Sequence, residues 1–345
     1  MKFKKLLASM LALSISPLCI LGIGASADEA DYIGSYHKEL TSGADIRIMT
    51  YNLLADNSEG GFGWGTPLGD RAEHAIDCMR YYMPDIIGIQ EATVAWYTAI
   101  KARNSATYAF VNPDVGTSKY YNCTGIMYNR RTMKFVESEL IKYSQGDNSR
   151  ARFMNIAVLR HAATAETIVF VCTHFNAGES AADVRELQAT ELAAKLNEYA
   201  EKYKCPIISV ADYNSKKGTE EQRIIIEEGH MAYSDAAPAA TIDHILYRGA
   251  VTPKYFAHVD DQWIKSASDH LPMFTDFALD NKPTANGDID EDGEVTVSDA
   301  LRALRMSAKI ETPTDREFII ANLDGDRKIT VSDALEILRR AVRLA

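Results

Sequence analysis

The sequence predicts an α/β domain followed by a small helical domain built on a duplicated loop. Between residues 45 and 280, short apolar runs that end in polar side chains alternate with segments of helical periodicity. After that region the composition becomes acidic, and a twelve-residue acidic segment occurs twice, 34 residues apart. Hydrophobic residues make up 46% of the chain and charged residues 25%, a balance that supports a sizeable core and excludes wholesale disorder.

The first 27 residues have the pattern of a secretory signal peptide. Three lysines precede an apolar run that ends in the small residues A-S-A. Pro17 interrupts the run and no charge cluster follows it, which disfavours a membrane anchor. We therefore expect a secreted, extracellular protein without stable membrane insertion. Residues 28–44 are interpreted as an N-terminal spacer.

The charge and the cysteines limit the function classes. The chain has 37 Lys and Arg against 48 Asp and Glu, and its net charge falls from −11 to −14 when the leader and its three lysines are removed. This acidity argues against a protein that coats nucleic acid. The remaining cysteines lie far apart without metal-ligand spacing, so we expect free thiols in preference to a disulfide. They are Cys78, Cys123, Cys172 and Cys205.

The predicted elements of the larger domain follow from apolar runs and periodicity. The runs that predict strands are residues 46–52, 85–91, 167–174, 206–214, 242–247 and 272–277. Helices are predicted at 70–82 and 183–203, the second with leucines spaced along one face. We interpret residues 45–280 as one α/β domain.

Polar side chains gather where these predicted strands end. Hydrolysis of a phosphoester needs a hard cation, a base-assisted water and stabilisation of the leaving oxygen. Carboxylates, amides and imidazoles at neighbouring strand ends supply these functions together. A glycosidase would need a carboxylate pair around a sugar site, and the sequence singles none out. The candidates are Asn52, Glu91, His174, Asp212, Asn214, Asp243, Asp269 and His270.

The order of these motifs resembles the endonuclease/exonuclease/phosphatase superfamily, whose fold is like that of deoxyribonuclease I. The motifs are Y-N-L, P-D-I-I-G-I-Q-E, T-H-x-N, D-Y-N, a strand aspartate and S-D-H-L-P. The resemblance implies a four-layer sandwich of two mixed β-sheets flanked by helices. It also implies a hydrolase that uses Mg²⁺ or Mn²⁺ to cleave phosphoester bonds.

The resemblance implies a role for each motif residue. Glu91 is expected to be the main metal ligand, with Asn52 and Asp269 helping to hold metal or phosphate. Asp212 and Asn214 match the motif that orients or deprotonates the attacking water.

His270 is expected to contact the scissile phosphate while Asp243 fixes its tautomer, and the general base is assigned jointly to Asp212 and His270. His174 matches a second histidine that faces phosphate. Asn176 is expected to orient His174, and Arg71 to bind substrate phosphate.

The duplicated loops, residues 288–299 and 322–333, carry oxygen ligands at the alternate positions that calcium prefers. The first loop offers Asp288, Asp290, Asp292, the carbonyl of Glu294, Thr296 and Asp299. The second offers Asn322, Asp324, Asp326, the carbonyl of Lys328, Thr330 and Asp333. We expect two Ca²⁺ ions. The first loop should bind more tightly, because the second has one carboxylate fewer and Arg327 where the first has Gly293.

The repeat resembles a type I dockerin, the duplicated module that attaches enzymes to cohesin domains of a cellulosome scaffold. We interpret residues 281–287 as a linker and 288–345 as this calcium-binding domain. The resemblance implies a cohesin partner. It assigns recognition to Val297-Ser298 and Val331-Ser332, whose identity suggests two nearly equivalent binding faces.

The sequence therefore predicts a secreted metal-dependent phosphoesterase, most simply a phosphodiesterase with nuclease-like activity, attached to a scaffold and otherwise monomeric. Its substrate is expected to be a phosphoester, with nucleic acid among the options. One alternative is a sphingomyelinase-like or small-phosphoester hydrolase, prompted by Arg185 and Gln188 after His174. The other is a binding module without catalysis.

Overall fold

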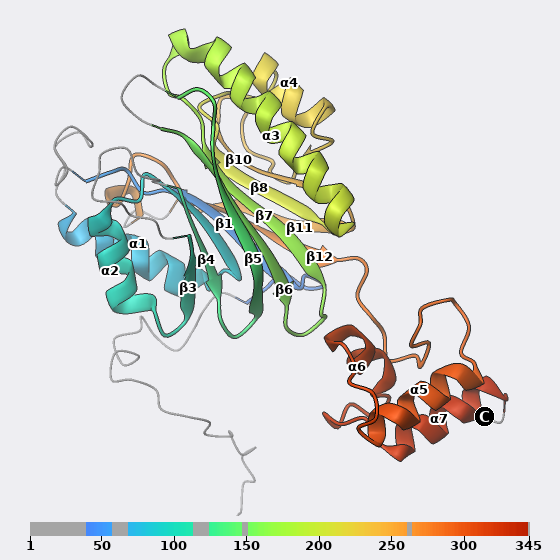
Figure 1. The fold of residues 1–345 in the computed structure, drawn as a ribbon. Helices are drawn as coiled ribbons and strands as arrows, with labels where there is room; N and C mark the ends of the chain where they lie inside the picture. The colour runs from blue at the N-terminus through green and yellow to red at the C-terminus, as the bar shows by residue number, and fades with distance from the viewer. Residues whose placement is uncertain (1–38, 57–67, 113–123, 147–150, 261–263, 344–345) are drawn as a thin grey trace, which may run out of the picture. The chain divides into compact units, whose positions relative to one another are not determined.

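The computed structural model describes residues 39–56, 68–112, 124–146, 151–260 and 264–343 (Figure 1). The predicted signal peptide, most of the predicted spacer and Cys123 lie outside these residues. Among the described residues, no helix combines the length and the apolar character needed to cross a bilayer. Cys78, Cys172 and Cys205 are free thiols.

Two six-stranded sheets form the centre of the larger domain. The first has the order β11 (Val251–His258), β12 (Met273–Leu279), β1 (Ile46–Asn52), β2 (Ile86–Gln90), β4 (Gly125–Asn129) and β3 (Tyr108–Val111). The second has the order β5 (Met133–Lys142), β6 (Phe153–His161), β7 (Thr167–His174), β8 (Ile207–Asp212), β10 (Asp243–Arg248) and β9 (Ala232–Tyr233). Both sheets are mixed, because β1–β2 and β7–β8 pair in parallel and the other pairs are antiparallel.

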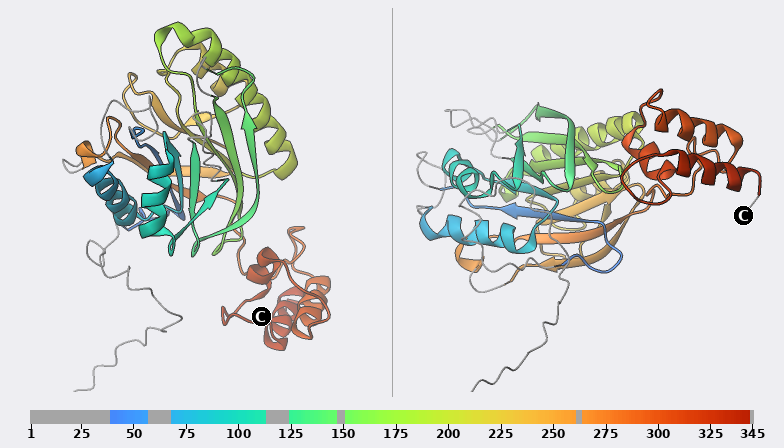
Figure 2. Two further views of the ribbon diagram at one scale, coloured as in Figure 1. Left: turned by 60° about the vertical axis from the view of Figure 1, so that its left-hand side comes forward. Right: turned by 90° about the horizontal axis from the view of Figure 1, so that it is seen from below.

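Helices cover the outer face of each sheet (Figures 1 and 2). The first sheet carries α1 (Gly69–Tyr82) and α2 (Val94–Asn104), and the second carries α3 (Ala182–Tyr203) and α4 (Glu220–Glu227). One apolar cluster packs between the sheets, and a further cluster lies between each sheet and its helices. These three cores make the four-layer arrangement that the sequence motifs imply.

The two sheets approach closely at Gly88, in the middle of β2. A Cβ atom at this position would lie 2.2 Å from Val210 Cγ2 and 3.0 Å from Cys172 Sγ, so no larger residue fits. Because this contact joins β2 to β7 and β8, it brings the ends of the parallel strands of both sheets to one edge.

A buried ion pair holds the opposite end of the first sheet. Arg47 on β1 donates from Nε to Asp276 on β12 at 2.6 Å, and both side chains are at most 1% exposed. The guanidinium also donates to the carbonyls of Tyr82 and Glu39 and lies 4.5 Å from the ring centroid of Phe274. Breaking one half of such a pair leaves a buried charge, which is strongly destabilising.

The C-terminal domain contains α5 (Val297–Ser307), α6 (Asp315–Ala321) and α7 (Val331–Ala341). Each helix begins with a capping box, in which a threonine and an acid three residues later satisfy each other's backbone N–H groups. The core consists mostly of small and branched residues, with one methionine: Ile289, Ala300, Ala303, Met306, Ile320, Ala321, Ala334 and Ile337. The loops and the helices after them occur where the repeat predicts them, and α6 is an addition that the sequence reading missed.

Candidate functional site

The predicted catalytic residues meet at the edge where parallel strands of both sheets end. Asn52 ends β1 and Glu91 follows β2, while His174 ends β7 and Asp212 ends β8. Parallel pairing places Asn52 beside Gln90, and His174 beside Asp212. Together with Asp243 and His270, these residues form what we call the strand-end cluster: Asn52, Glu91, His174, Asp212, Asp243 and His270.

Asp212 is the centre of this cluster. Its Oδ2 accepts a hydrogen bond from Asn52 Nδ2 at 2.9 Å, which links the two sheets. The same oxygen lies 3.4 Å from His174 Nε2 and 3.7 Å from His270 Nε2. Its Oδ1 accepts from the backbone N–H of Asn214. Asp212 is thus a buried carboxylate with an imidazole on either side.

His270 is held by Asp243, as the sequence predicts. The His270 Nδ1 and Asp243 Oδ2 atoms are 2.7 Å apart, so Nε2 is the nitrogen directed at Asp212. Asp243 lies opposite Asp212 in the antiparallel pairing of β10 with β8. This register places the Asp243–His270 pair at the same edge of the sheet as Asp212. The carboxylate of Asp243 holds a proton on Nδ1, so Nε2 carries a second proton only when the imidazole is charged.

Burial and neighbouring charges shift the pKa values of both groups. Burial and the adjacent carboxylate of Asp243 raise the pKa of Asp212 to about 7, although His270 acts against this rise. Burial alone would lower the pKa of His270, but the hydrogen bond that it donates to Asp243 and the nearby carboxylates raise it to about 10. A carboxyl group whose pKa lies near 7 forms an acid–base pair with a neighbouring imidazolium. Groups with such shifted pKa values are typical of functional sites.

Glu91 lies next to Asn52 in an unusual backbone conformation. Its φ is 57°, in the left-handed region that non-glycine residues rarely adopt. Its Oε1 accepts from Asn52 Nδ2 at 3.3 Å and its Oε2 from the backbone N–H of Ala55 at 2.9 Å. Strained residues of this kind cluster at functional sites. Its role as the main metal ligand stays a prediction.

Ser268 supports the cluster, and the sequence reading gave it no role. Its hydroxyl donates to the carbonyl of Asn52 at 2.7 Å and accepts from the backbone N–H of His270 at 3.1 Å. It thereby ties β1 to the segment that carries Asp269 and His270. Asp269 itself is exposed at the edge of the site.

Arg71 does not lie free to bind phosphate. It is 6% exposed, and its guanidinium donates to the carbonyls of Ala267, Leu53 and Leu54. The CZ atom lies 5.4 Å from the ring centroid of Trp96. The structure therefore gives Arg71 a scaffold position behind the site, where it holds two site-bearing loops together.

Asn176 and Asn214 stabilise the loops after β7 and β8. Asn176 Oδ1 accepts from Gln188 Nε2 at 2.9 Å, and the Gln188 side chain accepts from the Asn176 N–H. Asn214 has a φ of 49° and donates from Nδ2 to the carbonyl of Phe175 at 3.1 Å. These bonds position the two strand ends relative to each other. The predicted contact of Asn176 with His174 stays a prediction.

A metal ion has suitable donors here. One donor atom from each of Asp212, Asp243 and His270 lies within 4.8 Å of the others. A protonated imidazole offers no lone pair, so the carboxylates are the donors of this set while His270 is charged. Carboxylate and amide oxygens suit hard cations such as Mg²⁺ and Mn²⁺. The residues present therefore fit a hard divalent cation.

The duplicated loops of the C-terminal domain repeat the same hydrogen bonds. Asp292 Oδ1 accepts from the N–H of Glu294 at 2.9 Å, and Asp326 Oδ1 accepts from that of Lys328 at 2.9 Å. Asp288, Asp290 and Asp292 direct carboxylate oxygens to one place, within 4.8 Å of one another. The last acid of each loop, Asp299 or Asp333, also caps a helix through the threonine three residues before it. Thr296 and Thr330 are those N-caps.

Comparison with known proteins identifies the larger domain. Residues 49–270 match the model of a family described as Endonuclease/Exonuclease/phosphatase family. Tyrosyl-DNA phosphodiesterase 2 of Danio rerio is 25% identical over 185 residues, which are 54% of this chain and 45% of that protein. The chain thus matches less than half the length of this relative.

Solved structures show the same fold. The catalytic domain of human nocturnin superposes with a TM-score of 0.56 at 20% identity, covering 68% of this chain and 94% of that one. A mannosyl-6-phosphatase of Bacteroides thetaiotaomicron gives a TM-score of 0.57 at 18% identity, covering 68% of this chain and 99% of that one. At these identities the likeness concerns the fold alone.

Proposed function

Because this chain belongs to the endonuclease/exonuclease/phosphatase family, we propose that it is a metal-dependent phosphodiesterase with nuclease-like activity. The observation that carries this proposal is the position of Asp212 between His174 and His270. A buried carboxyl with a pKa of about 7 can accept a proton at neutral pH, and an imidazolium beside it can donate one. Hydrolysis of a phosphoester needs both.

In the proposed hydrolysis, each residue of the strand-end cluster has its own role. Asp212 accepts the proton of the attacking water through Oδ2. His270, oriented by Asp243, offers Nε2–H to a phosphoryl oxygen on which negative charge develops. His174 faces the same site from the other side of Asp212, where it helps to hold the phosphate. Asn52 fixes Asp212 by a direct hydrogen bond.

Glu91 and Asp269, with the amide oxygen of Asn52, would hold a Mg²⁺ or Mn²⁺ ion. When bound, the ion would polarise phosphoryl oxygens and neutralise their charge. Glu91 supports this assignment because it is a strand-end carboxylate in a strained conformation, with a neutral amide for its closest side-chain partner.

Related proteins suggest different ester classes. The name of the Danio rerio relative denotes a phosphodiesterase acting on tyrosyl-DNA, and the Bacteroides structure is named as a phosphatase of a mannosyl-6-phosphate. The net charge of −11 argues against tight nonspecific binding of long duplexes, whose affinity depends on Lys and Arg contacts with phosphates. We therefore favour a short or single-stranded phosphodiester.

The sphingomyelinase-like alternative depends on Arg185 and Gln188 as substrate-binding residues, and the structure does not support that role. Arg185 donates to Glu221 at 2.7 Å and to the carbonyls of Asn176 and Gly178, and its side chain is 8% exposed. Gln188 is buried and bonded to Asn176. Both residues thus stabilise the loop after His174 and do not face a ligand.

An activity panel tests the proposal. The purified chain is incubated with Mg²⁺ and single-stranded DNA, RNA, sphingomyelin, mannose 6-phosphate or bis(p-nitrophenyl) phosphate, beside a His270→Gln control. We expect hydrolysis of diesters, suppressed by a chelator and by His270→Gln. Hydrolysis of the monoester alone would replace the diesterase assignment. Inactivity on every substrate would favour the non-catalytic binding module.

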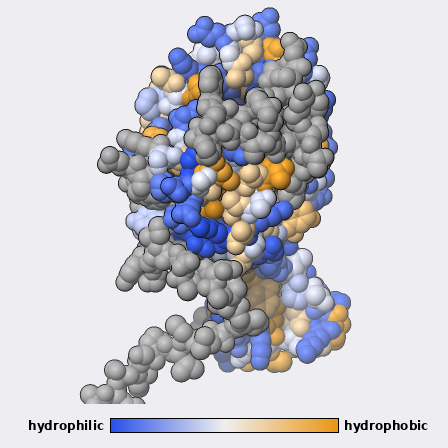
Figure 3. Space-filling model, turned by 90° about the vertical axis from the view of Figure 1, so that its left-hand side faces the viewer, coloured by the Kyte–Doolittle hydropathy of each residue, from blue (hydrophilic) through white to orange (hydrophobic). Residues whose placement is uncertain are grey.

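A second function, attachment to a scaffold, is supported by an apolar face on the C-terminal domain. Six apolar side chains on α5 and α7 are 37–63% exposed and line a shallow groove between the helices. They are related by the 34-residue repeat: Val297, Leu301 and Leu304 correspond to Val331, Leu335 and Leu338. On the face of the protein in Figure 3, by contrast, hydrophilic and hydrophobic residues are intermixed among those coloured. We propose that this apolar face docks a cohesin domain, as in type I dockerins, and that the protein is secreted.

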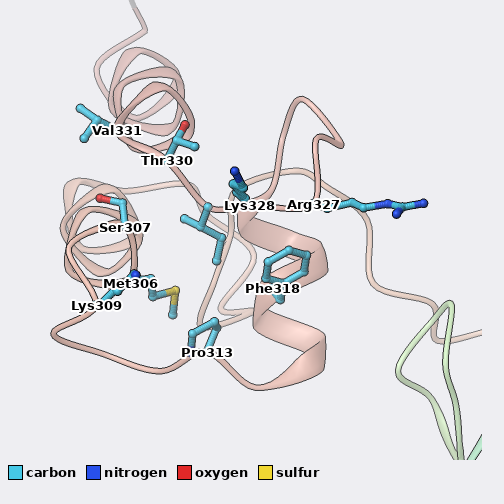
Figure 4. A pocket seen from close by; sticks show the side chains of 10 residues that line it. Met306, Ser307, Lys309, Pro313, Phe318, Arg327, Lys328, Thr330 and Val331 are labelled. Carbon is cyan, nitrogen blue, oxygen red and sulfur yellow. The ribbon is translucent and has the colours of Figure 1, made fainter. Parts of the chain in front are cut away.

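The two ends of this domain differ in charge. Beside the second loop, a hollow of about 560 Å³ has an apolar floor that includes Met306 and Phe318, with Lys309, Arg327 and Lys328 around it (Figure 4). No ion pair with a described residue engages these three cations. The repeat places Gly293 and Glu294 where Arg327 and Lys328 stand, so the two faces are less equivalent than their Val-Ser pairs suggest.

Two calcium ions are part of this proposal. Each loop has two left-handed positions, occupied by Glu291 and Gly293 in the first and by Gly325 and Arg327 in the second. Each loop therefore has one strained non-glycine residue, and the expected difference in strain between the loops disappears. Carboxylate number still favours the first loop. A calcium-dependent complex with a recombinant type I cohesin supports the scaffold proposal, and its absence at micromolar concentrations contradicts it.

A further inference from the structure

We propose that Asp235, a residue outside the strand-end cluster, is a positioning residue that couples the two segments carrying Asp212 and Asp243. It lies in the connection between β9 and β10, and its side chain is fully buried. One carboxylate oxygen contacts Lys217 and the other contacts His244. Measuring this role through turnover depends on the proposed phosphoesterase function.

Lys217 forms the first half of the link. It follows Asn214 by three residues, in the loop that continues from Asp212. Its Nζ lies 2.5 Å from Asp235 Oδ1 and donates to the carbonyls of Asp235 and Ala237 at 3.2 Å each. These three acceptors match the three donors of an ammonium group, so the end of the side chain is fixed.

The Lys217 side chain is also enclosed. Its Nζ lies 4.6 Å from the ring centroid of Tyr233, and the side chain is 22% exposed. A cation over an aromatic face gains electrostatic attraction. The loop after Asp212 is therefore tied to the segment that leads into β10.

His244 forms the second half of the link. It follows Asp243 on β10, its Nδ1 lies 3.3 Å from Asp235 Oδ2, and it has no exposed surface. Its ring packs against Tyr233 and Tyr213, with centroids 5.1 and 6.2 Å away. Successive side chains of a strand point to opposite faces, so a fixed His244 fixes the direction of Asp243.

The charge of Asp235 is essential to this arrangement. Burial alone would raise the pKa of Asp235, but the bonds with His244 and Lys217 lower it, so the carboxylate stays ionised. A neutral side chain would leave the Lys217 ammonium without its counter-charge. The loop of Asn214 and the strand of Asp243 would then lose their common anchor.

A small displacement of Asp243 would change the position of His270 and so affect turnover. The Asp243–His270 contact of 2.7 Å depends on where β10 ends. Displacing a catalytic group by about 1 Å can reduce turnover by roughly 100-fold. We expect Asp235→Asn to lower kcat roughly 10- to 100-fold with KM changed by less than about twofold, because Asp235 does not touch substrate.

The matched control is Asp276→Asn. Asp276 is an equally buried carboxylate that pairs with a cation, Arg47. Arg47 lies five residues before Asn52 on β1, which at about 3.4 Å per residue is roughly 17 Å from the site. Loss of this pair should lower the unfolding temperature without lowering kcat at a temperature where the protein is folded.

The experiment measures kcat and KM for bis(p-nitrophenyl) phosphate with Mg²⁺, on the whole chain, for wild type, Asp235→Asn, Lys217→Met and Asp276→Asn. A second readout needs no turnover: the imidazole signals of His270 in histidine-labelled protein, assigned with His270→Gln. We expect Asp235→Asn and Lys217→Met to lower kcat and move the His270 signals, and Asp276→Asn to do neither.

The proposal is overturned if both variants keep kcat within twofold of wild type, or if the His270 signals do not move. If Asp235→Asn does not fold, Lys217→Met decides by the same criteria, because that side chain is partly exposed. A wild type that is inactive on the diester contradicts the proposed function, and the His270 signals then decide the positioning role alone.

Discussion

Replacing Asp243 with Asn removes the charge that orients His270. The pKa of His270 lies at about 10 against a usual 6.5, which at about 1.4 kcal/mol per pKa unit favours the imidazolium by about 5 kcal/mol. Burial opposes this shift, the hydrogen bond to Asp243 and the charge of Asp243 contribute most to it, and Asp212 and Asp269 add to it. Loss of the Asp243 charge should raise the barrier by about 2–3 kcal/mol, a roughly 30- to 150-fold decrease in turnover.

The assay is hydrolysis of bis(p-nitrophenyl) phosphate with Mg²⁺ between pH 6 and 10, with circular dichroism to verify folding. Because the raised pKa keeps His270 protonated in alkaline solution, wild-type activity should decline only at high pH, and Asp243→Asn should decline at lower pH. If Asp243 acts through His270, the double variant Asp243→Asn/His270→Gln should be no slower than His270→Gln alone. Turnover within twofold of wild type and an unchanged pH profile would refute the pairing.

Other predictions concern the metal, stability and calcium. Glu91→Ala should abolish hydrolysis in a folded protein, and full activity would remove Glu91 from the metal site. Asp276→Ala should lower the free energy of unfolding in urea by about 3–5 kcal/mol, since it leaves a buried guanidinium without its counter-charge, and a loss below about 1 kcal/mol would contradict this. Burial raises the pKa of Asp85 from 3.8 to about 6, so its contribution to stability is present below pH 4 and lost as pH rises to 6. Asp85→Asn should flatten urea stability over that range, and an unchanged slope would exclude this origin. Asp290→Asn should weaken the tighter of two calcium sites in calorimetry, and an effect on the weaker site alone would reverse the ranking of the loops.

The strands and helices with strong local signals were predictable from the sequence. The apolar runs predict β1, β7 and β8 to within a residue or two, and α3 begins and ends within one residue of its predicted range. The edge strand β5 was missed because it alternates charged with apolar residues and is only partly buried, so it lacks a continuous apolar run. The helix α4 was missed because its 8 residues are too few to show a clear helical periodicity.

That these strand-end residues lie together was predictable from the sequence, but the residues that support them were not. Asp243 and His270 form the pair that the motifs imply: strand register places Asp243 beside Asp212, and His270 lies in the segment just before β12. Arg71 was misjudged because the sequence shows a cation but not the three carbonyl groups that surround it in the folded chain. Ser268 and Asp235 were given no role for a similar reason, since their partners are distant along the chain.

Local patterns also failed to separate core from surface in the C-terminal domain. Leucines at helical spacing on α5 and α7 look like core residues, yet Leu301 and Leu335 are about half exposed. The small residues Ala300, Ala303 and Ala334 form the core in their place, because α5 and α7 pack closely. Only the packing of the two helices against each other reveals which face is left uncovered.

The most direct test of the central claim compares wild type with Asp212→Asn in Mg²⁺-dependent hydrolysis of bis(p-nitrophenyl) phosphate. Asn keeps the size of the side chain and an oxygen that can accept from Asn52, but it cannot take the proton of water. The account predicts measurable kcat/KM for wild type and a loss of about 1,000-fold or more in the folded variant. Equal activity of the two proteins would contradict the claim that the strand-end cluster performs the hydrolysis.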